Sequence, residues 1–143
     1  MSQNKIVPDP ERVLLGFKRD MIKFLDDLVL QLPRVACLVT MRIFIKDRLD
    51  PNVAMNRLLL MLEKNDGEAR AIVEARDESF FLVGNRLEVT DDNMASLEEL
   101  RGIWRSGALA AGDKESIWKW VDRFMLWADH YSNAVQALAE RCE

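Results

Sequence analysis

The side chains that could support catalysis or metal binding are few in this sequence, and they lie far apart. His130 is the only histidine, so a pair of a nucleophile and a histidine would depend on this one residue. A zinc site would need cysteine or carboxylate ligands brought together from distant segments, because there is no second histidine. We therefore interpret His130 as a surface or half-buried residue of a helix.

Three pairs of adjacent acidic residues are the next candidates for acid–base chemistry: Asp26-Asp27, Asp91-Asp92 and Glu98-Glu99. Neighbouring residues of an α-helix point about 100° apart, so such a pair cannot act on one substrate as a catalytic dyad does. The second pair precedes an expected helix and is better explained by helix capping. The acidic pairs therefore indicate solvated helix faces and caps.

The segment from Gly107 to Lys114 has some likeness to a phosphate-binding loop. That motif needs a lysine directly after its second glycine, followed by serine or threonine. Here Asp113 separates Gly112 from Lys114 and would place a negative charge where a phosphate should bind. We predict no nucleotide site, no catalytic residue, no metal site and no cofactor, and hence that the protein is not an enzyme.

Composition narrows the classes of function further. The chain has 143 residues, of which 49% are hydrophobic, and a net charge of -4. Its basic residues are scattered among acidic ones, whereas binding to nucleic acid needs a concentrated positive field, so we do not expect nucleic acid as a partner. The apolar runs are too short for a membrane span. Two distant cysteines, Cys37 and Cys142, cannot form a multi-bridge framework, and they favour a reducing compartment.

Helix signals predominate along the chain. Asp9-Pro10 and Asp50-Pro51 each combine an N-cap residue with a proline suited to the first helical turn. Apolar residues then recur at spacings of three and four, which is typical of amphipathic helices. We expect residues 1–8 to be flexible and residues 9–143 to form a single helical domain. Its expected helices cover residues 10–32, 35–45, 51–64, 68–75, 91–105 and 113 onwards, with an irregular connector at 76–85 pinned by two aromatic residues.

The segment Val35–Ile45 is open to two interpretations. Several of its residues are β-branched, which favours a strand. The apolar segment nevertheless runs for about fifteen residues before Asp50, and strands are usually shorter. We therefore predict a buried helix here, and an all-α fold of five to six helices overall.

The last helix gives the strongest pattern. Asp113 is expected to cap it, and apolar residues then alternate by four and three for three heptads: Ile117, Val121, Phe124, Ala128, Tyr131, Val135 and Leu138. The tryptophans Trp118, Trp120 and Trp127 flank this seam on different sides, so they cannot all face one core. We predict that Trp120 and Trp127, seven residues apart, are covered either by another helix of this chain or by a protein partner.

Three blocks of sequence, in order, resemble those of a known group of proteins. The first is Phe24-Leu25-Asp26-Asp27-Leu28 with the following Leu32-Pro33. The second is Arg76-Asp77-Glu78-Ser79-Phe80-Phe81-Leu82, and the third joins Leu97–Trp104 to Lys114–Val121. Over residues 14 to 131 the chain resembles small helical proteins of nucleocytoplasmic large DNA viruses, the algal and amoebal giant viruses. It departs from that pattern at Trp120, where a tyrosine is expected.

This resemblance implies a setting but no catalytic residues. With it, we expect a non-enzymatic structural protein, such as a minor capsid or virion component that contacts other viral proteins and can self-associate. The expected location is the virion, and the host cytoplasm or virus factory during assembly. The alternative is a soluble intracellular binding module, such as a host-factor antagonist or a transcription accessory.

Overall fold

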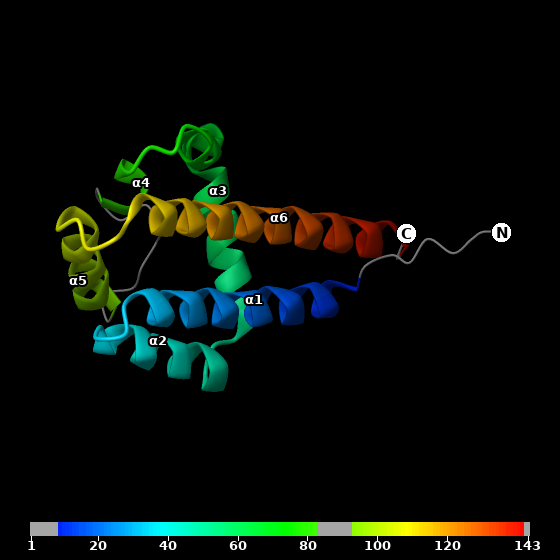
Figure 1. Cartoon of the computed structure of the whole chain (residues 1–143). Helices are drawn as coiled ribbons and strands as arrows, with labels where there is room; N and C mark the ends of the chain where they lie inside the picture. Colours follow the sequence, from blue (N-terminus) through cyan, green and yellow to red (C-terminus); the bar gives the residue numbers. More distant parts are fainter. Residues whose placement is uncertain (1–8, 83–92, 142–143) are drawn as a thin grey trace.

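The structure, a computed structural model, describes residues 9–82 and 93–141. Every regular element in these two ranges is a helix (Figure 1). The helices are α1 (Pro10–Gln31), α2 (Ala36–Asp47), α3 (Pro51–Glu74), α4 (Ser79–Leu82), α5 (Met94–Arg105) and α6 (Ala111–Arg141). The predicted all-α fold with a long C-terminal helix is thus confirmed. The expected flexibility of residues 1–8, the capping by Asp91-Asp92 and the position of Cys142 lie outside the described residues.

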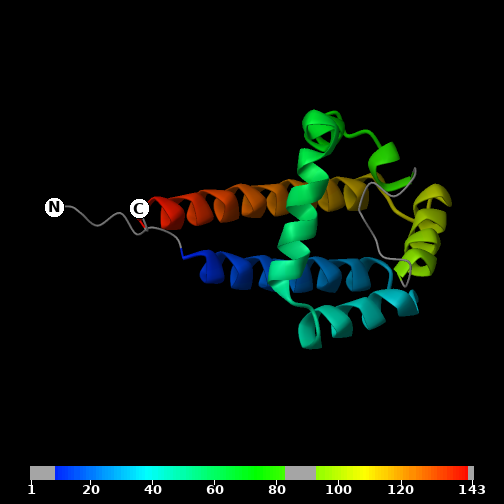
Figure 2. The ribbon, with the colours of Figure 1, turned by 180° about the vertical axis from the view of Figure 1, so that it is seen from behind.

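The helices form two crossed layers. In one layer α1 lies antiparallel to α6, and α2 packs along the opposite side of α1 (Figure 1). In the other layer the first arm of α3 crosses both α1 and α6, as Figure 2 shows from behind. Helix α5 closes the end of the bundle where α1 ends and α6 begins. As a result α2 lies at the edge of the assembly.

The two Asp-Pro signals begin helices as predicted. Asp9 accepts a hydrogen bond from the backbone nitrogen of Glu11 at 3.0 Å, and Asp50 accepts one from that of Asn52 at 2.9 Å. Each carboxylate thereby satisfies a backbone donor that the helix cannot satisfy itself. The segment after Pro33 is helical, so length outweighs β-branching there. The prediction that this helix is buried is wrong, because Leu38 is its one buried residue and Val39, Ile43 and Phe44 are exposed.

The expected break at residues 65–67 is also present. Asn65, Asp66 and Gly67 all have positive φ, and they divide α3 into two arms that point in different directions (Figure 2). Asparagine, aspartate and glycine are the residues that tolerate this left-handed conformation best.

Two local expectations need correction. Residues 79–82 of the expected irregular connector form the short helix α4, because Asp77 caps it by accepting from the backbone nitrogen of Ser79 at 3.0 Å. Helix α6 begins at Ala111, two residues before the expected cap. Asp113 still has a capping role, since it accepts a hydrogen bond from the backbone nitrogen of Ala110 at 3.1 Å.

The buried side chains form two clusters. The first joins α1, α3, α4 and α6 around Phe17, Met55, Phe80 and Trp118. The second joins α1, α2, α5 and the start of α6, with Leu38 and Trp104 among its members. Phe81 packs against both clusters, so α4 links the two parts of the core.

Candidate interaction sites

The seam between α1 and α6 is lined by aromatic rings. Phe124 packs edge-to-face on Phe17 and Phe24, with ring centroids 6.0 and 5.5 Å away, and its ring is stacked with that of Trp120 at 6.1 Å. Such pairs stabilise a fold beyond the area that they bury. Phe124 therefore lies at the centre of the seam, as its place in the heptad pattern predicts.

A buried carboxylate, Asp20, lies in the same seam. Its side chain has no exposed surface, and its Oδ2 accepts hydrogen bonds from Nε1 of Trp127 at 2.7 Å and Nε of Arg123 at 2.6 Å. Burial alone would raise the pKa of Asp20, but these two hydrogen bonds and the positive charges of Arg123 and Arg19 outweigh it, so the pKa is lowered. The second oxygen, Oδ1, has no hydrogen-bond partner among the residues that the structure describes. Asp20 thus ties two residues of α6 to α1 as an ion.

Trp127 is seated on a glycine of α1. A Cβ atom at Gly16 would lie 2.3 Å from Cη2 of the indole ring, far closer than van der Waals contact. The absence of a side chain at Gly16 therefore lets the ring approach the helix and reach Asp20 one turn further on.

Trp120 repeats this arrangement two turns earlier in α6. Its Nε1 donates to Asp27 of α1 at 2.9 Å, and its ring lies 5.9 Å from that of Phe24. Trp120 and Trp127 are both half-buried. Helix α1 therefore covers part of both indole rings, as one of the two predicted alternatives requires. A contact between these tryptophans and a protein partner stays a prediction.

The other two tryptophans point elsewhere. Trp118 and Trp104 are buried, and Phe81 contacts both of them, with ring centroids 4.7 and 5.0 Å away. The tryptophans of α6 therefore pack in two directions: Trp118 packs against α4, whereas Trp120 and Trp127 pack against α1. This division agrees with their spread around the helix.

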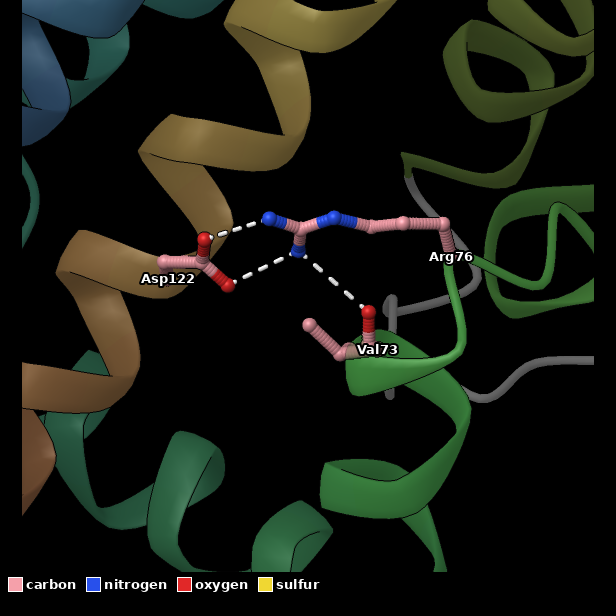
Figure 3. A network of polar contacts seen from close by, with 3 residues as sticks. All are labelled: Val73, Arg76 and Asp122. Carbon is pink, nitrogen blue, oxygen red and sulfur yellow. Dashed lines mark hydrogen bonds and ion pairs between the residues drawn. The ribbon is translucent and has the colours of Figure 1, made fainter.

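Arg76, which belongs to the second of the three resembling blocks, joins the end of α3 to α6 (Figure 3). Its guanidinium donates to both carboxylate oxygens of Asp122, at 2.9 and 2.7 Å, and to the backbone oxygen of Val73 at 3.3 Å. The hydrogen bonds from Arg76 lower the pKa of Asp122. Arg76 also has a φ of 54°, and the backbone bonds Arg76 N to Val73 O and Asp77 N to Ile72 O complete a Schellman helix end.

The residues singled out for chemistry are not brought together. His130 is exposed on α6, where its ring lies 6.1 Å from that of Trp127 in an edge contact. Glu98 forms an ion pair with Arg101 at 2.6 Å. The pKa of Cys37 is raised to about 11, mainly by burial and secondly by its hydrogen bond with Glu99. This raised pKa makes the thiol a poor nucleophile. Across residues 9–82 and 93–141 no group of three or more possible metal ligands occurs.

Helix α2 instead presents apolar side chains to solvent. Val39, Ile43 and Phe44 are 44%, 53% and 46% exposed, although Leu38 on the inner face has no exposed surface. Residues 39 and 43 lie one turn apart, and 44 adjoins 43, so the three form one patch. Leu15, Leu30 and Leu126 are exposed elsewhere, on α1 and α6.

Comparison with protein-family models, curated proteins and solved structures gives no match. No helix in the described part of the chain is both long and apolar enough to cross a membrane. The function must therefore be argued from the surfaces of the molecule.

Proposed function

We propose that this chain is a non-enzymatic structural protein that acts through protein–protein contacts, as a minor capsid or virion component of a large DNA virus. The exposed apolar patch of α2, formed by Val39, Ile43 and Phe44, carries the proposal that the protein makes such contacts. The viral setting rests on the three blocks of sequence that resemble the giant-virus group.

The patch supports contact with a protein because exposing it has a cost. Each apolar side chain that leaves water contributes roughly 25 cal/mol per Å² of buried surface. Contiguous exposed apolar residues edged by charged ones are a common mark of protein interfaces. Charged residues lie at and just beyond the two ends of α2: Arg34, Lys46, Asp47 and Arg48, all exposed.

The second candidate function is a soluble binding module of the infected cell. The same patch favours it, since a host factor or transcription factor could equally cover α2. The two functions differ in where the protein ends up. Mass spectrometry of purified virions decides between them: tens of copies per particle support a structural component, and absence from particles supports the binding module.

The contact surface is tested separately by substitution. Ile43→Asp should reduce incorporation into particles while the melting temperature stays close to that of the wild type, because residue 43 is exposed. Leu126→Asp is the matched control, since Leu126 is 54% exposed on α6, away from the patch. Equal incorporation of the two variants would contradict a role for α2.

Trp120 and Trp127 are proposed as a second contact, through the parts of their rings that α1 leaves exposed. Trp127→Ala should then weaken assembly while the isolated chain stays folded. If Trp127→Ala unfolds the monomer as severely as Phe124→Ala, the ring belongs to the core and this second contact is wrong.

A further inference from the structure

One side of the layer formed by α1 and α6 is not covered by α3. Figure 1 looks onto this side, with α3 behind the layer, and Figure 2 shows α3 crossing the opposite side. The contacts agree with this view, because Phe17 and Met21 of α1 pack in the core cluster that contains the buried residues of α3. The ion pair of Asp122 with Arg76 likewise ties α3 to the opposite side of α6.

Basic residues that are scattered in the sequence gather on the uncovered side. On α1, spacings of three and four residues place six side chains in one row: Arg12, Leu15, Arg19, Lys23, Asp26 and Leu30. On α6, Lys119 and Arg123 lie one turn apart, and Arg123 reaches across to Asp20 of α1 at 2.6 Å. The positive charge of Arg19 acts on the same carboxylate, so the two rows adjoin. We call these two rows the open face.

The carboxylates of the open face are already engaged. Asp20 is buried and binds Arg123, and Asp26 forms an ion pair with Arg42 of α2. Asp27, beside the row, accepts the hydrogen bond from an indole of α6 at 2.9 Å. None of the three is therefore left to neutralise the remaining cations.

Those remaining cations are exposed and unpaired within the described part of the chain: Arg12, Arg19, Lys23 and Lys119 form no ion pair and no side-chain hydrogen bond there. Glu115, one turn before Lys119, acts instead on Arg76 at the end of α3. With Arg42 and Arg123, the open face has six cations against three carboxylates, whereas the whole chain has a net charge of -4. The fold thus concentrates positive charge on one side of an acidic protein, which favours an anionic partner.

Two leucines select among anionic partners. Leu30 is 80% exposed and Leu15 is 65% exposed, the largest fractions among the exposed large apolar side chains of the described residues. They are fifteen residues apart, or about 22 Å along the helix, so they do not form the contiguous patch that a protein interface buries. The phosphates of a nucleic acid gain nothing from leucine. A lipid surface offers anionic headgroups to the cations and acyl chains to each leucine separately.

We propose that the open face binds the surface of a membrane that contains anionic phospholipids. Helices α1 and α6 lie side by side in one layer, so both rows can touch a flat surface together (Figure 1). The cations meet the headgroups, and Leu15 and Leu30 enter the boundary between headgroups and acyl chains. This contact does not use the α2 patch, so it is independent of the protein contact in the proposed function.

Sedimentation of the full chain with vesicles tests the proposal. The chain should bind vesicles of two parts phosphatidylcholine to one part phosphatidylserine, and not vesicles of phosphatidylcholine alone. Arg12→Gln/Lys23→Gln should weaken this binding about 30-fold, because each cation near such a surface contributes about fivefold. Leu15→Ala/Leu30→Ala should weaken it by at least about tenfold, through the apolar surface that no longer enters the membrane.

The matched controls lie on α3, on the opposite side of the layer (Figure 2). Arg57→Gln/Lys64→Gln removes two positive charges, and Val53→Ala/Leu60→Ala truncates two exposed apolar side chains. Both controls should bind like the wild type. Circular dichroism establishes that each variant is folded, and an unfolded double variant is replaced by its two single variants, each expected to weaken binding about threefold or more.

Three results would overturn the inference: no binding to the phosphatidylserine vesicles, equal binding to phosphatidylcholine alone, or losses in the α3 controls as large as those in the α1 variants. A chain that binds a single-stranded oligonucleotide but not the vesicles, and loses this in Arg12→Gln/Lys23→Gln but not in Leu15→Ala/Leu30→Ala, would assign the open face to nucleic acid instead. The proposed function is judged separately, by the presence of the chain in virions, so either can fail without the other.

Discussion

Replacing Asp20 by asparagine tests how the seam between α1 and α6 is held. Asparagine keeps the shape of the side chain and one oxygen acceptor, but it removes the negative charge. Hydrogen bonds to a charged group contribute about 1.5–3 kcal/mol, and Asp20 receives two, from Trp127 and Arg123. The side chain of Arg123 is 54% exposed, so water screens its share and the lower half of that range applies.

We therefore expect Asp20→Asn to lower the free energy of unfolding by about 2 kcal/mol. For a chain of this length that corresponds to a fall in melting temperature of about 7 °C. The measurements are a thermal melt and urea unfolding followed by circular dichroism. The matched control is Asp27→Asn, which removes a carboxylate charge that receives the same kind of indole hydrogen bond in the same seam. Asp27 is only half-buried, so its loss should cost about 1 kcal/mol or less.

The charge of Asp20 also predicts a dependence on pH. Because the pKa of Asp20 is lowered in the folded state, its contribution to stability is present above the unfolded value of about 3.9. That contribution is lost as the pH falls through the lower folded pKa. The difference in stability between the wild type and Asp20→Asn should thus be constant near neutral pH and shrink below about pH 4.

Two outcomes would refute this reasoning. If Asp20→Asn costs no more than Asp27→Asn, burial of the charge does not matter to the seam. If the difference in free energy of unfolding between wild type and Asp20→Asn stays constant down to pH 2, Asp20 does not stabilise the seam as an ionised carboxylate.

Four further predictions concern single side chains. Phe124→Ala should cost about 3–5 kcal/mol in urea unfolding, because it empties the middle of the aromatic seam, and a cost below 1 kcal/mol would place Phe124 outside the core. Gly16→Ala should destabilise the fold by about 1–3 kcal/mol despite the better helix propensity of alanine, since the new methyl group collides with the indole above it; a higher melting temperature would contradict that collision. Arg76→Ala should cost about 1 kcal/mol through the lost Asp122 pair, whereas Arg76→Gly should be nearly neutral because glycine relieves the left-handed backbone, so equal melts for the two would argue against that relief. His130→Ala should change stability by less than about 0.5 kcal/mol and leave any binding intact, and a folded variant that had lost binding would disprove this.

Much of the local structure could be predicted from the sequence. The Asp-Pro pairs at 9–10 and 50–51 begin helices, and Asn65-Asp66-Gly67 interrupts one, because capping and left-handed backbone depend on a few adjacent residues. The seam of α6 follows from periodicity as far as Tyr131, but Val135 and Leu138, which the same pattern includes, are exposed. The short helix α4 was not predicted, because four residues carry too little periodicity to separate a helix from a connector.

The contacts that hold the helices together could not be predicted in this way. Asp20 is one acid among 24 acidic residues in the sequence, and nothing local marks it as the one that Trp127 and Arg123 will bind. Gly16 likewise lacks a local signal of its role beneath an indole ring. The pairing of Arg76 with Asp122 also has no local signal, because the two residues are 46 positions apart in the sequence.

The sequence by itself determined most of the helical segments, the starts of those that follow an Asp-Pro pair, and the apolar faces of the long helices, because each of these depends on residues within a turn or two of one another. The tertiary structure decided which apolar faces meet and which remain open. That choice depends on the angles and registers between helices, which loops and side-chain volumes set jointly over the whole chain. It placed the apolar face of α6 against α1, and it left the outer face of α2, with Val39, Ile43 and Phe44, exposed to solvent.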